Sequence, residues 1–202
     1  MVVVGHDASL TLQERVRATI NLGESHFREF KSALTGAPGA KGARDPKDIR
    51  KDIGEALVAF ANADGGELLI GVEDSGIVTG IPHKAEVVDD LLSAWPTYVH
   101  PETPLPTPRT AIVVLEGRNV LYFAVEKGTA YVYLTSDGRC LQRRDRESTP
   151  VPSEHISFER QERLSREYDR TFVDGGDASV LDLEAVERIG EQIANIHGHS
   201  IG

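Results

Sequence analysis

Asp74 is a candidate metal ligand because of the pattern that precedes it. The apolar run 68–72 is too short for another helix and is typical of a strand that is covered on both faces. A turn is predicted at 74–76, after which 77–81 is expected to return as the partner strand of a hairpin. Asp74 is therefore expected where a central strand leaves the core. A carboxylate at such a place is held firmly but still meets water or a metal ion.

Two short stretches carry positive charge and are candidates for binding phosphate groups. Residues 31–51 contain six Lys and Arg against two Asp, and residues 139–146 contain four Arg against one Asp. Lys and Arg side chains bind phosphate oxygens and so position a nucleic acid. A charged run is also the ordinary composition of a solvated surface, so both interpretations remain open at this point. The candidate phosphate-binding residues are Lys31, Lys41, Arg44, Lys47, Arg139, Arg143, Arg144 and Arg146, with Lys31 the best single contact.

The composition of the whole chain narrows the class of protein. The 202 residues carry a formal net charge of −10, so any nucleic-acid contact must come from local patches. A single cysteine excludes an internal disulfide and fits a reducing compartment. No apolar run approaches the ~18 residues of a membrane span, and the first residues lack the basic region and apolar core of a signal peptide. We therefore expect a cytoplasmic protein with no membrane partner.

The elements that position these residues are predicted from apolar spacing. Apolar residues at helical intervals predict a helix over 46–60, with Asp45 as its N-cap and Pro46 as its first residue. Strands joined mostly by hairpins and interspersed with helices predict an α+β domain, with an antiparallel or mixed sheet and helices packed against it. The other predicted elements are helices over 9–21, 84–95, about 153–168 and 181–196, a strand over 24–31, a Gly/Ala/Pro loop over 35–45, a proline-rich extended connection over 96–108, and hairpins over 110–126 and 130–143.

Two blocks of the sequence resemble a known family. The segments ESHFREFK (24–31) and AFANADGGELLIGVEDSGIVTGI (59–81) are similar to the Schlafen AlbA_2 domain, whose pattern is E-S-x-x-x-E-F-K, a helix, and then A-F-A-N-x-x-G-G followed by an apolar strand and G-V-x-D. A third segment, CLQRRDRESTPVPSEHI (140–156), resembles the closing strand and helix of that domain. The predicted organisation is therefore an N-terminal helix over 1–22, an AlbA_2-like domain over 23–168, and an acidic turn with an amphipathic helix over 169–202.

The resemblance implies a metal site made of three carboxylates. In Schlafen proteins two Glu of the first block and the Asp after G-V-x support metal-dependent cleavage of structured RNA such as tRNA. Carried over to this sequence, Glu24, Glu29 and Asp74 are the expected catalytic residues and the expected ligands of Mg²⁺ or Mn²⁺. Such hard cations prefer carboxylate oxygens, and they activate water and neutralise charge on a phosphate.

The spacing of the two glutamates poses a geometric question. Glu24 and Glu29 are five residues apart, so a regular strand would place their side chains on opposite faces. A bulge at Gly23 would bring them together, and so would a strand that begins after Glu24. The sequence leaves both solutions open.

The resemblance implies two functions, and a third class remains. The first is a metal-dependent endoribonuclease that acts on structured RNA, more than on DNA; a chain with one lobe would form a homodimer to enclose its substrate. The second is a non-catalytic DNA-binding domain of a bacterial transcriptional regulator, which is how many bacterial relatives are labelled. The third is a scaffold that acts through the helix over 181–196 and has no affinity for nucleic acid.

Overall fold

Residues 6–37 and 39–162 are described in the computed structural model of the chain. For residues 6–10 the backbone alone is described. The predicted helix over 181–196 and the predicted domain boundary at 168 lie outside the described residues.

The chain divides into two units, 1–157 and 158–202. The described part of the second unit, 158–162, is helical. None of the helices in the described part of the chain combines the length and the apolar character needed to cross a membrane. All elements discussed below belong to the first unit.

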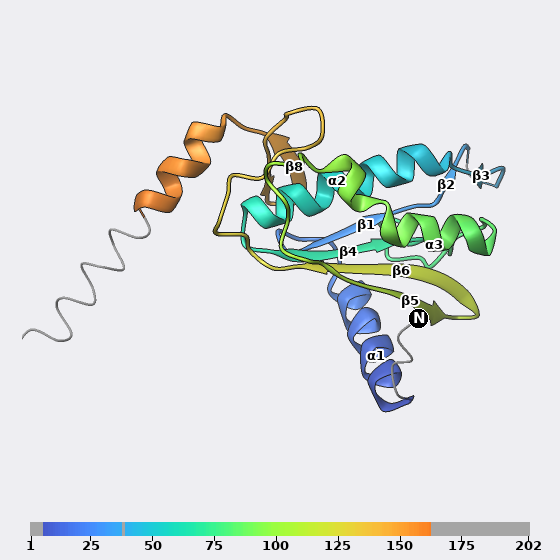
Figure 1. Ribbon diagram of the computed structural model, residues 1–202. Coiled ribbons are helices and arrows are strands. Elements are labelled where there is room, and N and C mark those ends of the chain that lie inside the picture. Colours follow the sequence, from blue (N-terminus) through green and yellow to red (C-terminus); the bar gives the residue numbers. More distant parts are fainter. Residues whose placement is uncertain (1–5, 38, 163–202) are drawn as a thin grey trace, which may run out of the picture. The chain divides into compact units, whose positions relative to one another are not determined.

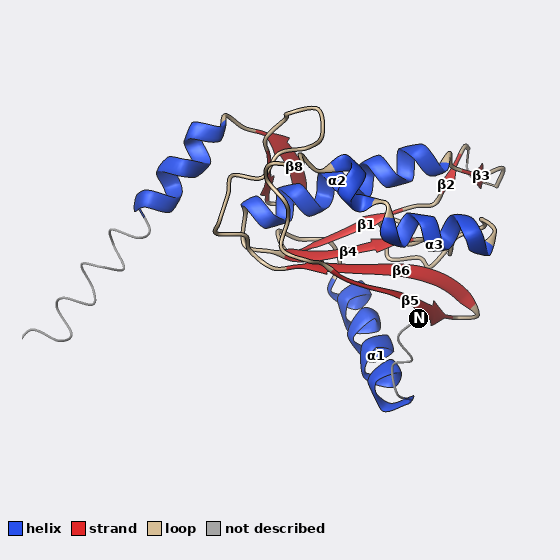
Figure 2. Ribbon diagram, in the orientation of Figure 1, coloured by secondary structure: helices blue, strands red, loops and turns tan. Residues whose placement is uncertain are grey.

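A four-stranded mixed sheet is the centre of the first unit, as Figures 1 and 2 show. Its strand order is β1-β4-β6-β5, with β1 parallel to β4 and the other neighbours antiparallel. The expected α+β fold with a mixed sheet is confirmed. The strands are β1 (Arg28–Lys31), β4 (Gly66–Ile70), β5 (Arg109–Leu115) and β6 (Arg118–Val125).

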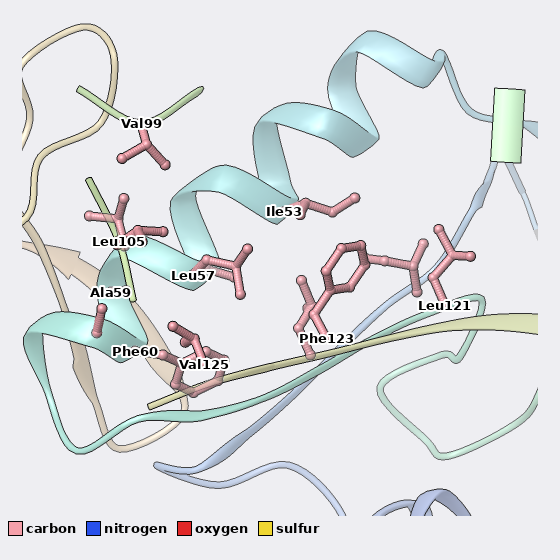
Figure 3. Close-up of a cluster of buried hydrophobic side chains, with 14 of the residues drawn as sticks. Ile53, Leu57, Ala59, Phe60, Val99, Leu105, Leu121, Phe123 and Val125 are labelled. Atoms are coloured by element: carbon pink, nitrogen blue, oxygen red, sulfur yellow. The ribbon is translucent and has the colours of Figure 1, made fainter. Parts of the chain in front are cut away.

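Helices cover the two faces of this sheet. α2 (Pro46–Asn62) and α3 (Ala85–Ser93) lie over one face, and α1 (His6–Leu22) lies against the other (Figure 1). Figure 3 shows side chains of α2, among them Leu57 and Phe60, facing side chains of β6. A second buried cluster on the α1 side includes Val16 and residues of β1, β4, β5 and β6.

The sequence determines both ends of α2. The Asp45 side chain accepts a hydrogen bond from the Lys47 amide (2.8 Å), and Pro46 occupies the first turn, where its missing N–H costs nothing. After the last helical residue the chain turns toward β4 at Gly65, whose φ of 79° favours glycine. The predicted helix is therefore confirmed, with an end at Asn62 instead of residue 60.

Shorter elements complete the unit. β2 (Leu34–Thr35) pairs with β3 (Gly42–Ala43) inside the predicted Gly/Ala/Pro loop, so that loop is partly ordered as a small ladder. A 3₁₀ helix, η1 (Trp95–Tyr98), begins the proline-rich connection, which was predicted to be extended throughout. β7 (Leu141–Arg144) pairs with β8 (Glu147–Pro150) in an antiparallel hairpin.

The first predicted hairpin, over 110–126, is confirmed. β5 and β6 are joined through Glu116 and Gly117, whose φ values are 51° and 73°. Positive φ at both central residues is the two-residue turn whose twist matches that of the flanking strands.

The second predicted hairpin, over 130–143, is present only as a tight turn with a short antiparallel contact. Only one bridge, between Leu134 and Cys140, joins its halves. The main chain of Tyr133 is hydrogen-bonded to the Asn62 side chain, which accepts from the Tyr133 amide (2.8 Å) and donates to the Tyr133 carbonyl (2.7 Å). The predicted partner strand over 77–81 is likewise reduced to a single bridge, between Val72 and Val78.

Close packing of α2 gives a test of the fold. A Cβ at Gly54 would lie 2.3 Å from Cβ of Tyr98, which forces a shift. We expect Gly54→Ala to lower the free energy of unfolding, because overpacking costs about 1–3 kcal/mol and exceeds the ~1 kcal/mol gain in helix propensity. Urea denaturation measures the change. Gly42→Ala is the control because no atom lies within 4 Å of its added Cβ, and equal stability of the two variants would contradict the packing.

Candidate functional site

Glu29 of β1 is buried and held by two cations. One carboxylate oxygen lies 2.7 Å from Nη1 of Arg143, and the other lies 2.8 Å from Nζ of Lys31. Lys31 is two residues further along the strand and so shares a face with Glu29. Ser148 of β8 makes a further contact of 3.4 Å through its hydroxyl. Both oxygens of this expected metal ligand are therefore already bound to protein groups.

Arg143 of β7 is the centre of this network. Its side chain is fully buried, and its guanidinium carbon lies 5.3 Å from the centre of the Phe60 ring. Besides Glu29, it donates hydrogen bonds to the carbonyl oxygens of Arg28 (3.1 Å) and Ser25 (3.2 Å). Arg143, predicted to bind phosphate, is therefore a structural residue that joins the β7–β8 hairpin to β1.

Lys31 responds to the same carboxylate. Although burial lowers the pKa of Lys31, the attraction of Glu29 outweighs it and raises the pKa above its ordinary value. Lys31 therefore stays charged, but its ammonium group is directed to Glu29 and only about a third of its side chain is exposed.

Glu24 precedes β1 and folds back onto it. One of its oxygens accepts a hydrogen bond from the Phe30 amide (2.9 Å), and the other lies 3.4 Å from Nη2 of Arg146. A small turn closed by reciprocal main-chain hydrogen bonds between Ser25 and Arg28 makes this possible. Of the two solutions that the sequence left open, the structure has the strand beginning after Glu24.

Asp74 is exposed in the turn after β4. Its neighbour Glu73 points the other way and binds the Ser32 hydroxyl (2.6 Å) and Nζ of Lys41 (2.7 Å). In the described part of the chain no three acidic, His or Cys side chains are placed to hold a metal ion. The arrangement of Glu24, Glu29 and Asp74 therefore does not fit Mg²⁺ or Mn²⁺, which need several oxygen ligands around one point.

A cleft of about 370 Å³ opens beside Glu29. Asp52 and Glu55 of α2 line it, and the sequence analysis did not select either of them. They are three residues apart, which places them on one face of the helix. The cleft has four carboxylates against two cations. Its lining is Glu29, Lys31, Asp52, Glu55, Ala56, Arg146, Glu147 and Ser148.

The structure separates the predicted phosphate-binding residues into two groups. Six of them are held in ion pairs, namely Lys31 and Arg143 with Glu29, Lys41 with Glu73, Arg44 with Asp52, Arg139 with Glu55, and Arg146 with Glu24 at a longer 3.4 Å. The other two, Lys47 and Arg144, are exposed, and so is Arg146. Arg144 and Arg146 lie at the β7–β8 turn and line a second cleft of about 440 Å³ with Glu24, Asp145 and Glu147.

A third cleft, of about 530 Å³, lies beside the turn that enters β4. Its cations outnumber its acids by one, and the sequence analysis missed them because they come from α1, β1, β5 and the segment after β6. A cluster built from such distant segments leaves no pattern in the sequence. The charged residues of its lining are Arg15, Arg28, Arg109 and Lys127, with Asp64, Glu67 and Glu126.

Glu67 has the densest hydrogen bonding in this third cleft. It accepts hydrogen bonds from Arg15 (2.5 Å), Tyr122 (2.7 Å) and Thr19 (2.8 Å). Although burial raises the pKa of Glu67, these hydrogen bonds outweigh it and lower the pKa below its usual value. Burial and the hydrogen bond to Glu67 raise the pKa of Tyr122 to about 12.

Comparison with known proteins gives one family match and two solved structures. A family model described as Schlafen, AlbA_2 matches residues 24–152. Among solved structures, the DIP2311 protein from Corynebacterium diphtheriae is 22% identical over 73% of this chain and 27% of that chain, with a TM-score of 0.51. The N-terminal domain of a putative ATP-dependent DNA helicase RecG-related protein from Nitrosomonas europaea is 25% identical over 60% of this chain and 74% of that chain, with a TM-score of 0.38. The chain thus spans about a quarter of the DIP2311 chain, and that likeness bears on the fold alone.

The buried ion pair gives a direct test. Glu29→Gln keeps the shape of the side chain but leaves the Arg143 charge without its carboxylate, so we expect the free energy of unfolding to fall by about 3–5 kcal/mol. Asp74→Asn is the matched control, because an exposed substitution usually stays within about 0.5 kcal/mol. Chemical denaturation of both variants measures the difference. A Glu29→Gln variant as stable as the parent would contradict the structural role.

The Tyr122–Glu67 pair predicts how stability depends on pH. Because the folded-state pKa of Tyr122 is raised, its contribution is complete below the ordinary tyrosine value of about 10 and is lost as the pH rises toward about 12. Because the pKa of Glu67 is lowered, its contribution is lost as the pH falls below the ordinary glutamate range. Tyrosine absorbance, followed from neutral to alkaline pH, should show a late titration that disappears in Tyr122→Phe and persists in Tyr98→Phe.

Proposed function

The chain belongs to the Schlafen AlbA_2 family, and from this premise we propose that it is a nucleic-acid-binding domain whose acidic residues at positions 24, 29 and 74 do not catalyse cleavage. The observation that carries the proposal is the buried ion pair between Glu29 and Arg143. To bind a cation, Glu29 would have to release Lys31 or Arg143, and release of Arg143 would leave a buried guanidinium uncompensated, which is strongly unfavourable. The expected metal-dependent endoribonuclease is thus the less favoured function.

The turn of the β7–β8 hairpin is the surface we propose for phosphate contact. Arg144 hydrogen-bonds Gln142 (3.3 Å), and within the described residues the contact of Arg146 is a long one of 3.4 Å to Glu24. Both guanidinium groups are exposed and keep N–H donors that can meet phosphate oxygens in pairs. Lys31, the residue that the sequence favoured, is a weaker candidate because Glu29 holds it.

Recognition at this turn follows the phosphate backbone rather than base identity. The described residues that line the cleft beneath it are all charged, and none of them has an aromatic ring on which a base would stack. Binding without base contacts is weak, with dissociation constants on the order of 10⁻⁴ to 10⁻⁶ M, and it weakens steeply with salt. The net charge of −10 opposes it further. We propose structured RNA as the first partner and duplex DNA as the second.

A titration tests this proposal. Fluorescently labelled RNA hairpin and DNA duplex are titrated with the full chain at low and increasing salt, and binding is followed by anisotropy. Arg144→Ala combined with Arg146→Ala removes two phosphate contacts, so the slope of log affinity against log salt should fall by about two units. The control, Arg17→Ala combined with Lys84→Ala, removes the same charge from exposed sites on α1 and before α3.

The outcomes separate the candidate functions. Equal loss of affinity in the two double variants would remove the hairpin turn as the contact surface, and no affinity at low salt would remove nucleic-acid binding itself. The same protein is incubated with tRNA and Mn²⁺ alongside Glu24→Gln and Asp74→Asn. Cleavage by the parent that both substitutions abolish would restore the endoribonuclease, whereas intact RNA supports a binding domain.

A further inference from the structure

The two edges of the main sheet are treated differently by the sequence. At the β1 edge the outward main-chain groups are occupied by side chains, since the Phe30 amide donates to Glu24 (2.9 Å) and the Arg28 carbonyl accepts from Arg143 (3.1 Å). The β5 edge lies on the opposite side of the sheet, beyond β6 (Figure 1). An edge strand with free main-chain groups is a template for pairing with another strand.

The hairpin turn fixes which groups of β5 point outward. Leu115 and Arg118 flank the two-residue turn and pair directly, so alternate residues of β5 from Leu115 backwards bond to β6. The main-chain groups of Thr110, Ile112 and Val114 therefore point away from β6. Gln13 of α1 confirms this direction, because its side-chain amide donates to the Val114 carbonyl (3.2 Å).

All three side chains at these outward positions are exposed, and two of them are apolar. Ile112 is 41% exposed and Val114 is 49% exposed, although the alternate residues Val113 and Leu115 are buried against the α1 side. A charged side chain is one of the features that usually protect an edge strand from pairing. None of Thr110, Ile112 and Val114 carries a charge. The outward positions of β5 thus carry no protecting charge, and Gln13 is the one side chain among the described residues that hydrogen-bonds to their main chain.

We propose that the β5 edge binds a second copy of this chain. Antiparallel pairing of two β5 strands about a two-fold axis at Ile112 sets Ile112 against Ile112, and Thr110 against Val114, in both halves. This register sets Arg109 of each copy opposite Leu115 of the other, one residue from Glu116, so opposite charges lie near each other at both ends of the pairing. The two sheets join into one sheet, which brings the α1 helices to the same face.

This pairing would break few of the existing interactions of β5. The hydrogen bond from Gln13 to the Val114 carbonyl is exchanged for one from the Thr110 amide of the second copy, and the Ile112 and Val114 side chains leave water together. Each copy carries a charge of −10, so repulsion opposes association at low salt. The dimer should therefore strengthen as salt rises, whereas nucleic-acid binding should weaken.

The proposal is tested by introducing charges at the proposed two-fold axis. Analytical ultracentrifugation of the full chain at moderate salt should show a reversible dimer. Ile112→Lys and Ile112→Glu should each be monomeric, because like charges would face each other at the axis, and an equal mixture of the two should recover the dimer. Leu22→Lys is the control, since Leu22 is 68% exposed at the end of α1, near β1. Circular dichroism and thermal melting check that each variant is folded.

Several results would overturn the proposal. These are a monomeric parent chain at high concentration, a dimer that persists in Ile112→Lys, a mixture that stays monomeric, and a Leu22→Lys variant that also dissociates. Slow hydrogen exchange of the Ile112 amide in a monomer would likewise show that residues of the same chain cover this edge. The proposal does not rest on nucleic-acid binding, so it can fail or succeed independently of the proposed function.

Discussion

The buried ion pair between Glu29 and Arg143 is the interaction on which the rest of the unit depends. The two residues are 114 positions apart, and they fasten the β7–β8 hairpin to an edge strand of the main sheet. Burial of two charges is expensive unless both are fully hydrogen-bonded. Here Lys31 and Ser148 also bind the carboxylate, and the guanidinium donates to two carbonyl oxygens and lies over the Phe60 ring. Among the described residues, Nε of Arg143 alone in this network has no hydrogen-bond partner. Loss of either partner would leave a charge in the core, which makes the pairing specific.

This interaction also decides what chemistry the acidic residues can do. A carboxylate that serves a metal ion needs free lone pairs directed at a common point. Glu29 directs its oxygens to two cations, Glu24 directs one to the Phe30 amide, and Asp74 faces solvent. Two of the acids that suggest a catalytic centre in the sequence, Glu24 and Glu29, thus hold the β1 edge and the hairpin in place. The stable arrangement of these charges and a metal centre compete for the same oxygens.

Local signals in the sequence account for much of the fold. The N-cap at Asp45 and the glycine turn at Gly65 determine α2, and the motif that spans 59–81 identifies the family, because these features act over a few residues. The partner of Glu29 and the cluster of Arg15, Arg28, Arg109 and Lys127 could not be predicted. Each depends on residues brought together by the sheet, and spacing along the chain carries no information about them.

Asn62 shows how one buried side chain overrides a local pattern. The alternation at 130–135 favours a strand, yet the Asn62 amide binds both main-chain groups of Tyr133 and donates as well to the Leu141 carbonyl (2.8 Å). A buried amide must satisfy its donors and acceptor, and the nearest main chain supplies them. β7 pairs with β8 along 141–144, and this hairpin carries Arg143 to Glu29. Two buried polar side chains therefore fix this part of the chain from both sides, since Asn62 binds the main chain of Tyr133 and Leu141 and Arg143 binds Glu29 of β1.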